Sequence, residues 1–211
     1  MLKMNKKIVT LIIVVVCATI IFGIKFFKED SIKDFNLQIS EKTIGHPHAP
    51  IRIIEFVDFQ CPSCASGFKY LKKFMREHPN TILLRVKYFP LTSIHKHALI
   101  SARYAECASR QDKFWPFYDL LFKHQGQWSG LDHAAPIFES IAQKADLDFE
   151  KLNHCLEDKK VDELIEENKE YGSSLGVKSI PTYFVNGRIT VGNKSLRLEL
   201  DRLIKDFQEH I

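Results

Sequence analysis

The sequence has little net charge and few cysteines for its length. It carries 30 basic and 26 acidic residues in 211 positions, and residues 1–30 hold five of the lysines with only two acids. Residues 31–211 therefore hold 25 basic and 24 acidic residues, a net charge of +1. So small an excess gives no reason to expect nucleic-acid binding. A dense disulfide framework is not needed for folding, because sixteen Phe and two Trp can fill a sizeable core.

One long apolar run lies near the amino terminus. Ile8 to Ile24 are seventeen positions without a charge, which span roughly 25 Å as a helix against the roughly 30 Å of a bilayer core. Extension to Phe27 closes the gap if Lys25 reaches the headgroups. No A-x-A-like cleavage site follows, so residues 1–30 predict an uncleaved signal anchor, the alternative being a cleaved signal and a soluble periplasmic protein. The lysines before the run place the rest of the chain outside the cytoplasm, where disulfides persist.

After a polar linker over residues 31–50, the spacing of apolar residues predicts an α/β domain over residues 51–211. A dense apolar run at 51–59 is typical of a buried strand, a helical pattern follows Cys64 as far as His78, and a second apolar run lies at 82–89. Strand–helix–strand order of this kind predicts parallel pairing through a right-handed crossover.

Strand signals vanish between about residues 92 and 176, which predicts an all-helical insertion. Strands then return on either side of Asn186-Gly187, a strong hairpin signal, and an amphipathic helix ends the chain. The expected helices are 95–109, 112–124, 133–145, 148–156, 158–174 and 195–209, and the expected hairpin strands are 181–185 and 188–191.

The pattern with the clearest chemistry is Cys61-Pro62-Ser63-Cys64, between a strand and a helix. A helix amino terminus carries unpaired N–H groups and positive dipole character, so a thiolate there is stabilised and its pKa falls. Pro62 suits the first helical turn, where its missing N–H costs nothing. Cys61 is then the candidate nucleophile, and Cys64 can resolve a mixed disulfide. The alternatives are half of a zinc site, which lacks suitably spaced partner ligands, and a purely structural disulfide.

A second candidate feature is Pro181, in Ser179-Ile180-Pro181-Thr182 at the start of a strand. A cis bond there would turn the backbone N–H and C=O of Ile180 toward the dithiol, and an extended substrate segment could pair with them in β fashion. We therefore expect substrate contacts from Ile180, Pro62 and Ser63. From the residues alone a cis bond is uncommon, since about 5% of X–Pro bonds adopt it.

Three segments together carry a resemblance to a known family. They are Glu55-Phe56-x-x-Phe59-x-Cys61-Pro62-x-Cys64, the region from Cys107 to Trp115, and Ile180-Pro181-Thr182-x-Phe184-Val185-Asn186-Gly187. Over about residues 44–209 the chain resembles the DsbA-like thiol oxidoreductases, most closely the BdbD-type branch of the thioredoxin superfamily.

The resemblance implies a thioredoxin fold with a helical insertion and a cis peptide before Pro181. It implies Cys61 as the attacking thiolate and Cys64 as the resolving thiol. It also implies that Glu55 is buried behind Cys64 and relays its proton, the alternative being a strand-edge Glu that faces water. The strongest oxidants of the family carry His where this chain has Ser63, a weaker donor, so we expect a less oxidising pair.

Cys107 and Cys155 are the two cysteines left in the exported part. In an oxidising compartment they most simply pair, and some relatives resemble this pattern. The bridge would close a loop of about 49 residues, worth roughly 4 kcal/mol in the chain-entropy account. The alternative is two buried free thiols on apolar helix faces.

The remaining polar and aromatic residues suggest ordinary structural roles. Asp58 is expected at the surface or as a helix cap, with no catalytic role, and His95 could approach the dithiol. Five further histidines are expected at the surface: His46, His48, His124, His133 and His210. An aromatic helix face is expected to form the core of the insertion rather than a peptide groove: Phe114, Trp115, Phe117, Tyr118, Leu121 and Phe122.

Together these features predict a membrane-tethered thiol:disulfide oxidoreductase that donates the Cys61–Cys64 disulfide to reduced secreted or membrane polypeptides. The family resemblance implies reoxidation by a DsbB-like or vitamin-K-epoxide-reductase-like membrane protein. The redox-active disulfide is the only cofactor expected, with no metal and no nucleic acid. The alternatives are a disulfide reductase or isomerase of the same fold, for which no dimerisation module is visible, and a non-enzymatic tethered chaperone that uses the apolar insertion face.

Overall fold

The computed structural model describes residues 42–209 of the chain. The anchor expected at residues 1–30 and the first part of the expected linker lie outside these residues. Within residues 42–209, no helix combines the length and the apolar character that crossing a bilayer requires.

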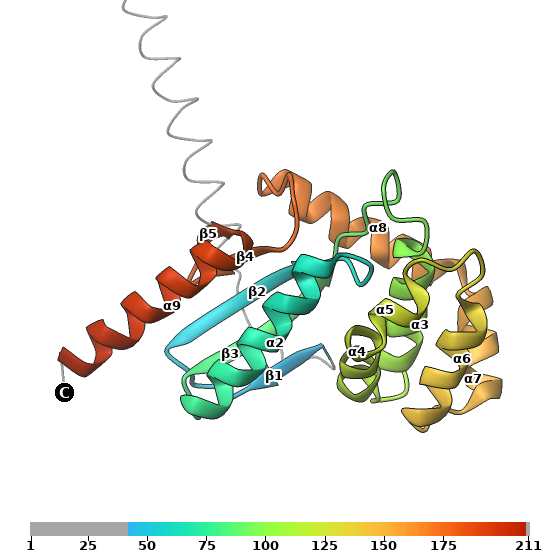
Figure 1. Ribbon diagram of the computed structural model, residues 1–211, viewed down its shortest axis with the longest axis horizontal. Helices are drawn as coiled ribbons and strands as arrows, with labels where there is room; N and C mark the ends of the chain where they lie inside the picture. The colour runs from blue at the N-terminus through green and yellow to red at the C-terminus, as the bar shows by residue number, and fades with distance from the viewer. Residues whose placement is uncertain (1–41, 210–211) are drawn as a thin grey trace, which may run out of the picture. The chain divides into compact units, whose positions relative to one another are not determined.

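A mixed sheet forms the centre of the fold (Figure 1). Its strand order is β1-β3-β2-β4-β5. The neighbours β2 and β3 are parallel, as the strand–helix–strand pattern predicts, and the other neighbouring pairs are antiparallel. The strands are β1 (Thr43–Gly45), β2 (Ile51–Val57), β3 (Ile82–Tyr88), β4 (Thr182–Val185) and β5 (Arg188–Val191).

The helices follow the expected periodicity closely. The helix α2 connects β2 to β3, six helices follow β3, and α9 ends the described chain. Figure 1 shows α3–α7 gathered at one side of the sheet while α9 extends at the other. The bounds are α2 (Pro62–Glu77), α3 (Ala98–Ser109), α4 (Phe114–Lys123), α5 (Gln125–Trp128), α6 (Ala135–Lys144), α7 (Phe149–Glu157), α8 (Lys159–Ser174) and α9 (Gly192–Glu209).

Apolar side chains pack on both faces of the sheet. On one face, Ile53 and Val185 join Leu71 of α2 and Leu196 of α9 in a buried cluster. On the other face, α8 approaches so closely that a Cβ at Gly172 would lie 2.7 Å from Cε1 of Phe56. A larger cluster continues from the end of β2 into the insertion. The larger of these two clusters therefore joins the end of the sheet to the helices of the insertion.

Two local features show how the sequence sets the fold. The residues Asn186 and Gly187 both have positive φ, 48° and 80°, as the tight turn of a β-hairpin requires. The expected α/β architecture with a helical insertion is confirmed. The strand β1 was not expected: Thr43–Gly45 lies within the stretch read as linker and pairs with the edge of β3. Three residues are too few to show a strand periodicity.

Candidate active site

The two cysteines of the motif lie where β2 gives way to α2. Cys61 has extended backbone angles and occupies the N-cap position, with Pro62 in the first turn of α2. Cys61 is 8% exposed and Cys64 is fully buried. The structure contains the pair as free thiols. The reacting sulfur therefore lies at the positive end of a helix, just below the surface.

The surroundings move the pKa values of the two thiols in opposite directions. Hydrogen bonding from the Cys64 thiol lowers the pKa of Cys61 to about 6, against the effect of burial. The backbone N–H groups of Cys64 and Ser63 add to the lowering, and the charge of Asp58 opposes it. Burial, followed by the interaction with Cys61, raises the pKa of Cys64 well above its usual value. Cys61 is thus the thiolate and Cys64 the thiol near neutral pH.

Glu55 lies on β2, and its side chain is fully buried. The Tyr118 hydroxyl donates to its Oε2 at 3.0 Å. Its Oε1 has no hydrogen-bond partner within the part of the chain that the structure describes. Burial raises the pKa of Glu55 to about 8, and the hydrogen bond from Tyr118 offsets only part of that rise. The alternative of a water-facing Glu does not hold, and the carboxyl is mostly protonated at pH 7.

The Ile180–Pro181 peptide bond is cis. It precedes β4, whose first residue, Thr182, pairs with Phe56 near the end of β2. Ile180 is partly exposed and packs against the hydrophobic cluster that includes both active-site cysteines. The sheet register and this packing bring Pro181 to the same end of the sheet as the dithiol.

Cys107 of α3 and Cys155 of α7 form a disulfide with an S–S distance of 2.07 Å. Both residues are buried. The bond joins two helices of the insertion across 48 positions of sequence.

The prediction that Asp58 lies at the surface or caps a helix is wrong. Asp58 is 2% exposed rather than at the surface, and Cys61, the N-cap of α2, has no side-chain cap. Its carboxylate accepts from the backbone N–H groups of Gln60 and Leu91, at 2.8 and 2.9 Å. It also lies 2.9 Å from Nδ1 of His95. These donors compensate the burial of a carboxyl directly after an apolar strand, and they come mainly from a loop distant in sequence.

Two glutamines that the sequence reading missed fix the backbone around the cysteines. The buried amide of Gln125 donates to the carbonyl oxygens of Phe59 and Cys61, at 2.7 and 3.0 Å. Gln60 donates to Ser129 and accepts from the backbone N–H of His97. Gln60 could have been noticed as a polar residue directly before Cys61, but no local signal marks Gln125.

Ser63 is exposed, and its carbonyl accepts a hydrogen bond of 2.8 Å from the side chain of Asn193. The same amide donates to Oγ of Ser66, and the Tyr183 hydroxyl donates to Oδ1 of Asn193. A Cβ at Gly67 would lie 2.1 Å from that hydroxyl. Asn193, at the start of α9, therefore ties α9 to one side of α2, and the absence of a side chain at Gly67 permits the close approach.

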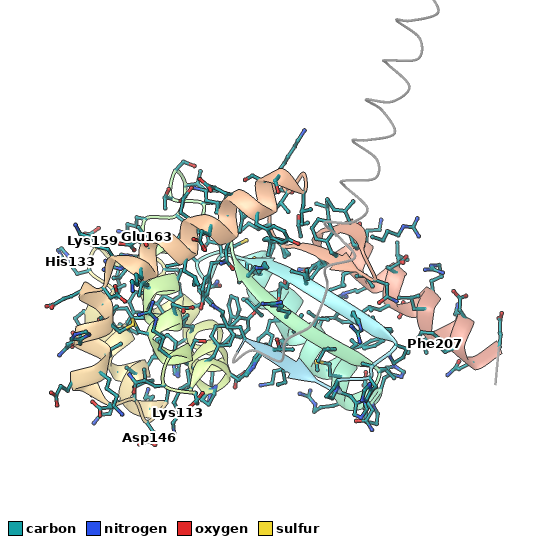
Figure 2. All side chains as sticks on the ribbon, turned by 180° about the vertical axis from the view of Figure 1, so that it is seen from behind. Lys113, His133, Asp146, Lys159, Glu163 and Phe207 are labelled. Atoms are coloured by element: carbon teal, nitrogen blue, oxygen red, sulfur yellow. A yellow bond between two sulfur atoms is a disulfide. The ribbon has the colours of Figure 1, made fainter. Side chains whose placement is uncertain are left out.

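The histidines near the surface take no part in the site. His46, His48 and His133 are exposed, His124 is partly exposed, and His210 lies outside the described residues. In Figure 2, His133 lies at the periphery of the insertion, as do Lys113 and Asp146, which form an ion pair at 3.0 Å. Within residues 42–209, no group of His, Cys, Asp and Glu is arranged to hold a metal ion.

Comparison with known proteins identifies the family. A family model described as Thioredoxin matches residues 38–206, so the chain belongs to the thioredoxin family. The expected thioredoxin fold is thereby confirmed.

Two proteins of similar sequence match the chain over different shares of their length. The chain is 24% identical to the probable disulfide bond formation protein D of Bacillus cereus over 201 residues, 92% of each protein. It is 32% identical to the Na(+)/H(+) antiporter NhaA 1 of Salinispora arenicola over 144 residues, which are 68% of this chain. The chain spans only about a fifth of the length of that antiporter, 21%.

Solved structures share the fold. Alpha-DsbA1 of Wolbachia pipientis superposes with a TM-score of 0.68 at 23% identity, over 80% of this chain and 91% of that one. BdbD of Bacillus subtilis gives a TM-score of 0.66 at 18% identity, over 78% of this chain and 92% of that one. The predicted resemblance to DsbA-like proteins is confirmed.

Proposed function

We propose that the protein introduces disulfide bonds into secreted or membrane polypeptides by exchange with a Cys61–Cys64 disulfide. The observation that carries this proposal is the pKa of Cys61, lowered to about 6 at the amino terminus of α2. With this pKa, Cys61 of the reduced protein is mainly a thiolate at neutral pH. Because this stabilises the reduced state, the disulfide is a better oxidant than one between ordinary thiols.

The exchange begins with the protein in its disulfide form. A substrate thiolate attacks Sγ of Cys61, a mixed disulfide forms, and Cys64 leaves as a thiolate. A second substrate thiolate then attacks the substrate sulfur of the mixed disulfide and releases Cys61. The substrate dithiol loses two electrons and two protons. The protein gains both electrons. Cys61 is released as the thiolate and Cys64 ends as the thiol, so the protein keeps one of the two protons and the other goes to solvent.

Glu55 is the proposed proton donor to Cys64. Its carboxyl, with a pKa of about 8, is protonated at pH 7, and its charge when ionised would raise the pKa of Cys64 further. Both groups are fully buried, so bulk water is a poor proton source for either. Transfer from Glu55 neutralises the Cys64 thiolate as it leaves Cys61.

Pro181 and Ile180 are proposed to receive the substrate backbone. Ile180 lies just before β4, at the end of the sheet where β2 leads to Cys61, and its backbone N–H and C=O are proposed to pair with an extended segment. Pro62 and Ser63 are the exposed residues next to Cys61 and supply the remaining contacts. The Cys107–Cys155 bridge is proposed to be structural, because it joins two insertion helices and not the reacting groups.

We further propose that residues 1–30 anchor the protein in the cytoplasmic membrane, with the catalytic domain on the extracytoplasmic side. The seventeen uncharged residues from Ile8 support this, as does the full-length similarity to a Bacillus disulfide bond formation protein. A DsbB-like or vitamin-K-epoxide-reductase-like membrane protein is the proposed reoxidant. It would accept the two electrons that the dithiol gains in each cycle.

The direction of exchange is tested by equilibrating the full chain in glutathione buffers of known ratio. An oxidant is expected to have a potential well above the value of about −270 mV for thioredoxin. The absorbance of the Cys61 thiolate should titrate with a midpoint near pH 6. A potential at or below that of thioredoxin would assign the protein to reduction instead. A Cys61→Ser protein with full cellular function would exclude an enzymatic role.

A further inference from the structure

A groove lies between α2 and α4, beside the active site. The two helices run side by side in Figure 1, and Phe68 of α2 packs on Tyr118 of α4 with ring centres 4.5 Å apart. The groove has a volume of about 610 Å³. Its apolar lining consists of Pro62, Ala65, Phe68 and Phe122. Pro62 directly follows Cys61 in the chain, so one end of the groove lies next to the proposed reacting cysteine.

The polar lining of the groove is strongly cationic. It includes Lys69, Lys72, Arg76 and Lys123 but only one carboxylate, Asp119. Lys72 already pairs with Asp119 at 2.5 Å. The other three cations are exposed and have no ion-pair partner within residues 42–209. The groove therefore presents about three uncompensated positive charges above an apolar floor.

The opposite side of α2 is occupied by protein. There Asn193 bonds to the carbonyl of Ser63 and to Oγ of Ser66, and joins α9 to α2. A polypeptide that reacts at Cys61 and continues along α2 can therefore bind in the groove on the α4 side of α2. An inorganic anion would use the cations but not the apolar floor, whereas a polypeptide segment can use both.

We propose that this groove binds an acidic, partly apolar segment of the unfolded substrate, next to the substrate cysteine that reacts with Cys61. The inference rests on the proposed function and adds a substrate preference to it. Carboxylates of the segment pair with Lys69, Arg76 and Lys123, while its apolar side chains cover Phe68 and Phe122. The groove thus selects clients by the charge of the residues that flank their cysteines.

The geometry of α2 sets the spacing of those acidic residues. From Pro62, Lys69 lies seven residues along the helix and Arg76 fourteen, or roughly 10 and 21 Å at the helical rise. An extended peptide covers about 3.3 Å per residue. The preferred acidic residues are therefore about three to six positions from the reacting cysteine.

The test uses the full chain in neutral detergent, oxidised at Cys61 and Cys64. It is mixed at low ionic strength with reduced two-cysteine peptides that carry Glu, Gln or Lys three to six positions from one cysteine. Separate peptide sets place these residues on its amino or carboxyl side. Acid quenching and mass spectrometry give the second-order rate constant of peptide oxidation.

The groove variant replaces Lys69, Arg76 and Lys123 by Gln. A matched control replaces three exposed lysines outside the groove by Gln, and so changes the net charge equally: Lys144, Lys159 and Lys205. We expect the unchanged protein to oxidise the Glu peptide about tenfold faster than the Gln peptide, as three exposed ion pairs allow. The groove variant should lose this preference without a change toward the Gln peptide, and the control should keep it.

The other possible outcomes contradict either the groove assignment or the proposed function. Equal rates for all peptides with the unchanged protein, or a Glu preference that survives in the groove variant, overturn the groove assignment while the proposed function stands. A groove variant that keeps the preference but binds less anionic phosphatidylglycerol in mixed micelles assigns the cations to a membrane surface instead. No oxidation of any peptide contradicts the proposed function, and the groove assignment falls with it.

Discussion

The buried carboxyl of Glu55 makes a prediction that is independent of activity. Glu55→Gln keeps the size of the side chain and an oxygen that can accept from Tyr118, but removes the titrating group. Because burial raises the pKa of Glu55 from 4.5 to about 8, folding favours its protonated form. The contribution of Glu55 to stability is complete below pH 4.5 and is lost as the pH rises through 8.

The size of the effect follows from the two pKa values. Between pH 4.5 and 8 the wild-type protein loses about 1.4 kcal/mol per pH unit relative to a variant without the group. The advantage of Glu55→Gln should therefore increase by about 2.5 kcal/mol between pH 5 and pH 7 and level off above pH 8. Any difference in packing between Glu and Gln adds a constant and leaves this slope unchanged.

Denaturant unfolding of the oxidised protein across pH 5–9 measures the slope, since Cys61 and Cys64 do not titrate as a disulfide. Glu163→Gln is the matched control, because Glu163 is exposed on α8 (Figure 2). It should show no dependence of this kind. If the stability difference between wild type and Glu55→Gln stays constant from pH 5 to pH 8, the carboxyl is ionised in the fold and its proposed role as proton donor is wrong.

Three further predictions concern the cysteines and the packing. Replacing both Cys107 and Cys155 by Ala should lower the free energy of unfolding by roughly 4 kcal/mol and leave the Cys61 titration unchanged; an unchanged unfolding midpoint would contradict this. In the reduced protein, the lowered pKa of Cys61 stabilises the fold above that pKa. The free energy of unfolding of wild type should therefore rise by roughly 2.5 kcal/mol relative to Cys61→Ser between pH 5 and pH 8. A difference between the two proteins that does not depend on pH would mean that Cys61 is an ordinary thiol. Gly172→Ala should destabilise by about 1–3 kcal/mol, because its Cβ would lie 2.7 Å from a buried ring, whereas Gly126→Ala has open space and should not; thermal unfolding compares the two.

The sequence predicts most elements of this fold because their apolar residues recur with regular periods. The helix expected at 158–174 is found at Lys159–Ser174, and the hairpin expected around Asn186-Gly187 is present. Strand β1 escaped notice because its residues are only partly buried or exposed and it pairs at the sheet edge. Short edge elements are determined by their partner strand, which a local pattern does not contain.

The residues of the candidate site are predictable from the sequence only where their partners lie close by in the chain. The dithiol is visible in the sequence because strand, cysteines, proline and helix are contiguous. An acid directly after an apolar strand is usually solvated or caps the next helix, so the sequence predicts Asp58 at the surface or as a helix cap. The fold instead supplies donors from Leu91 and His95, more than thirty residues away. Gln125 is further still, 64 positions along the chain from Cys61.

The helical insertion contributes residues to the candidate redox site and does not only cover it. It contributes the hydroxyl of Tyr118 to Glu55 and the amide of Gln125 to the backbone of Cys61. The first contact ends on the carboxyl proposed to donate a proton to Cys64, and the second ends on the backbone carbonyl of Cys61. Because Tyr118 lies on α4 and Gln125 on α5, a shift of α4 would change the surroundings of Glu55 and a shift of α5 those of Cys61. The insertion also supplies one wall of the cationic groove, so the proposed substrate selection and the proposed thiol exchange both involve the interface between α2 and α4.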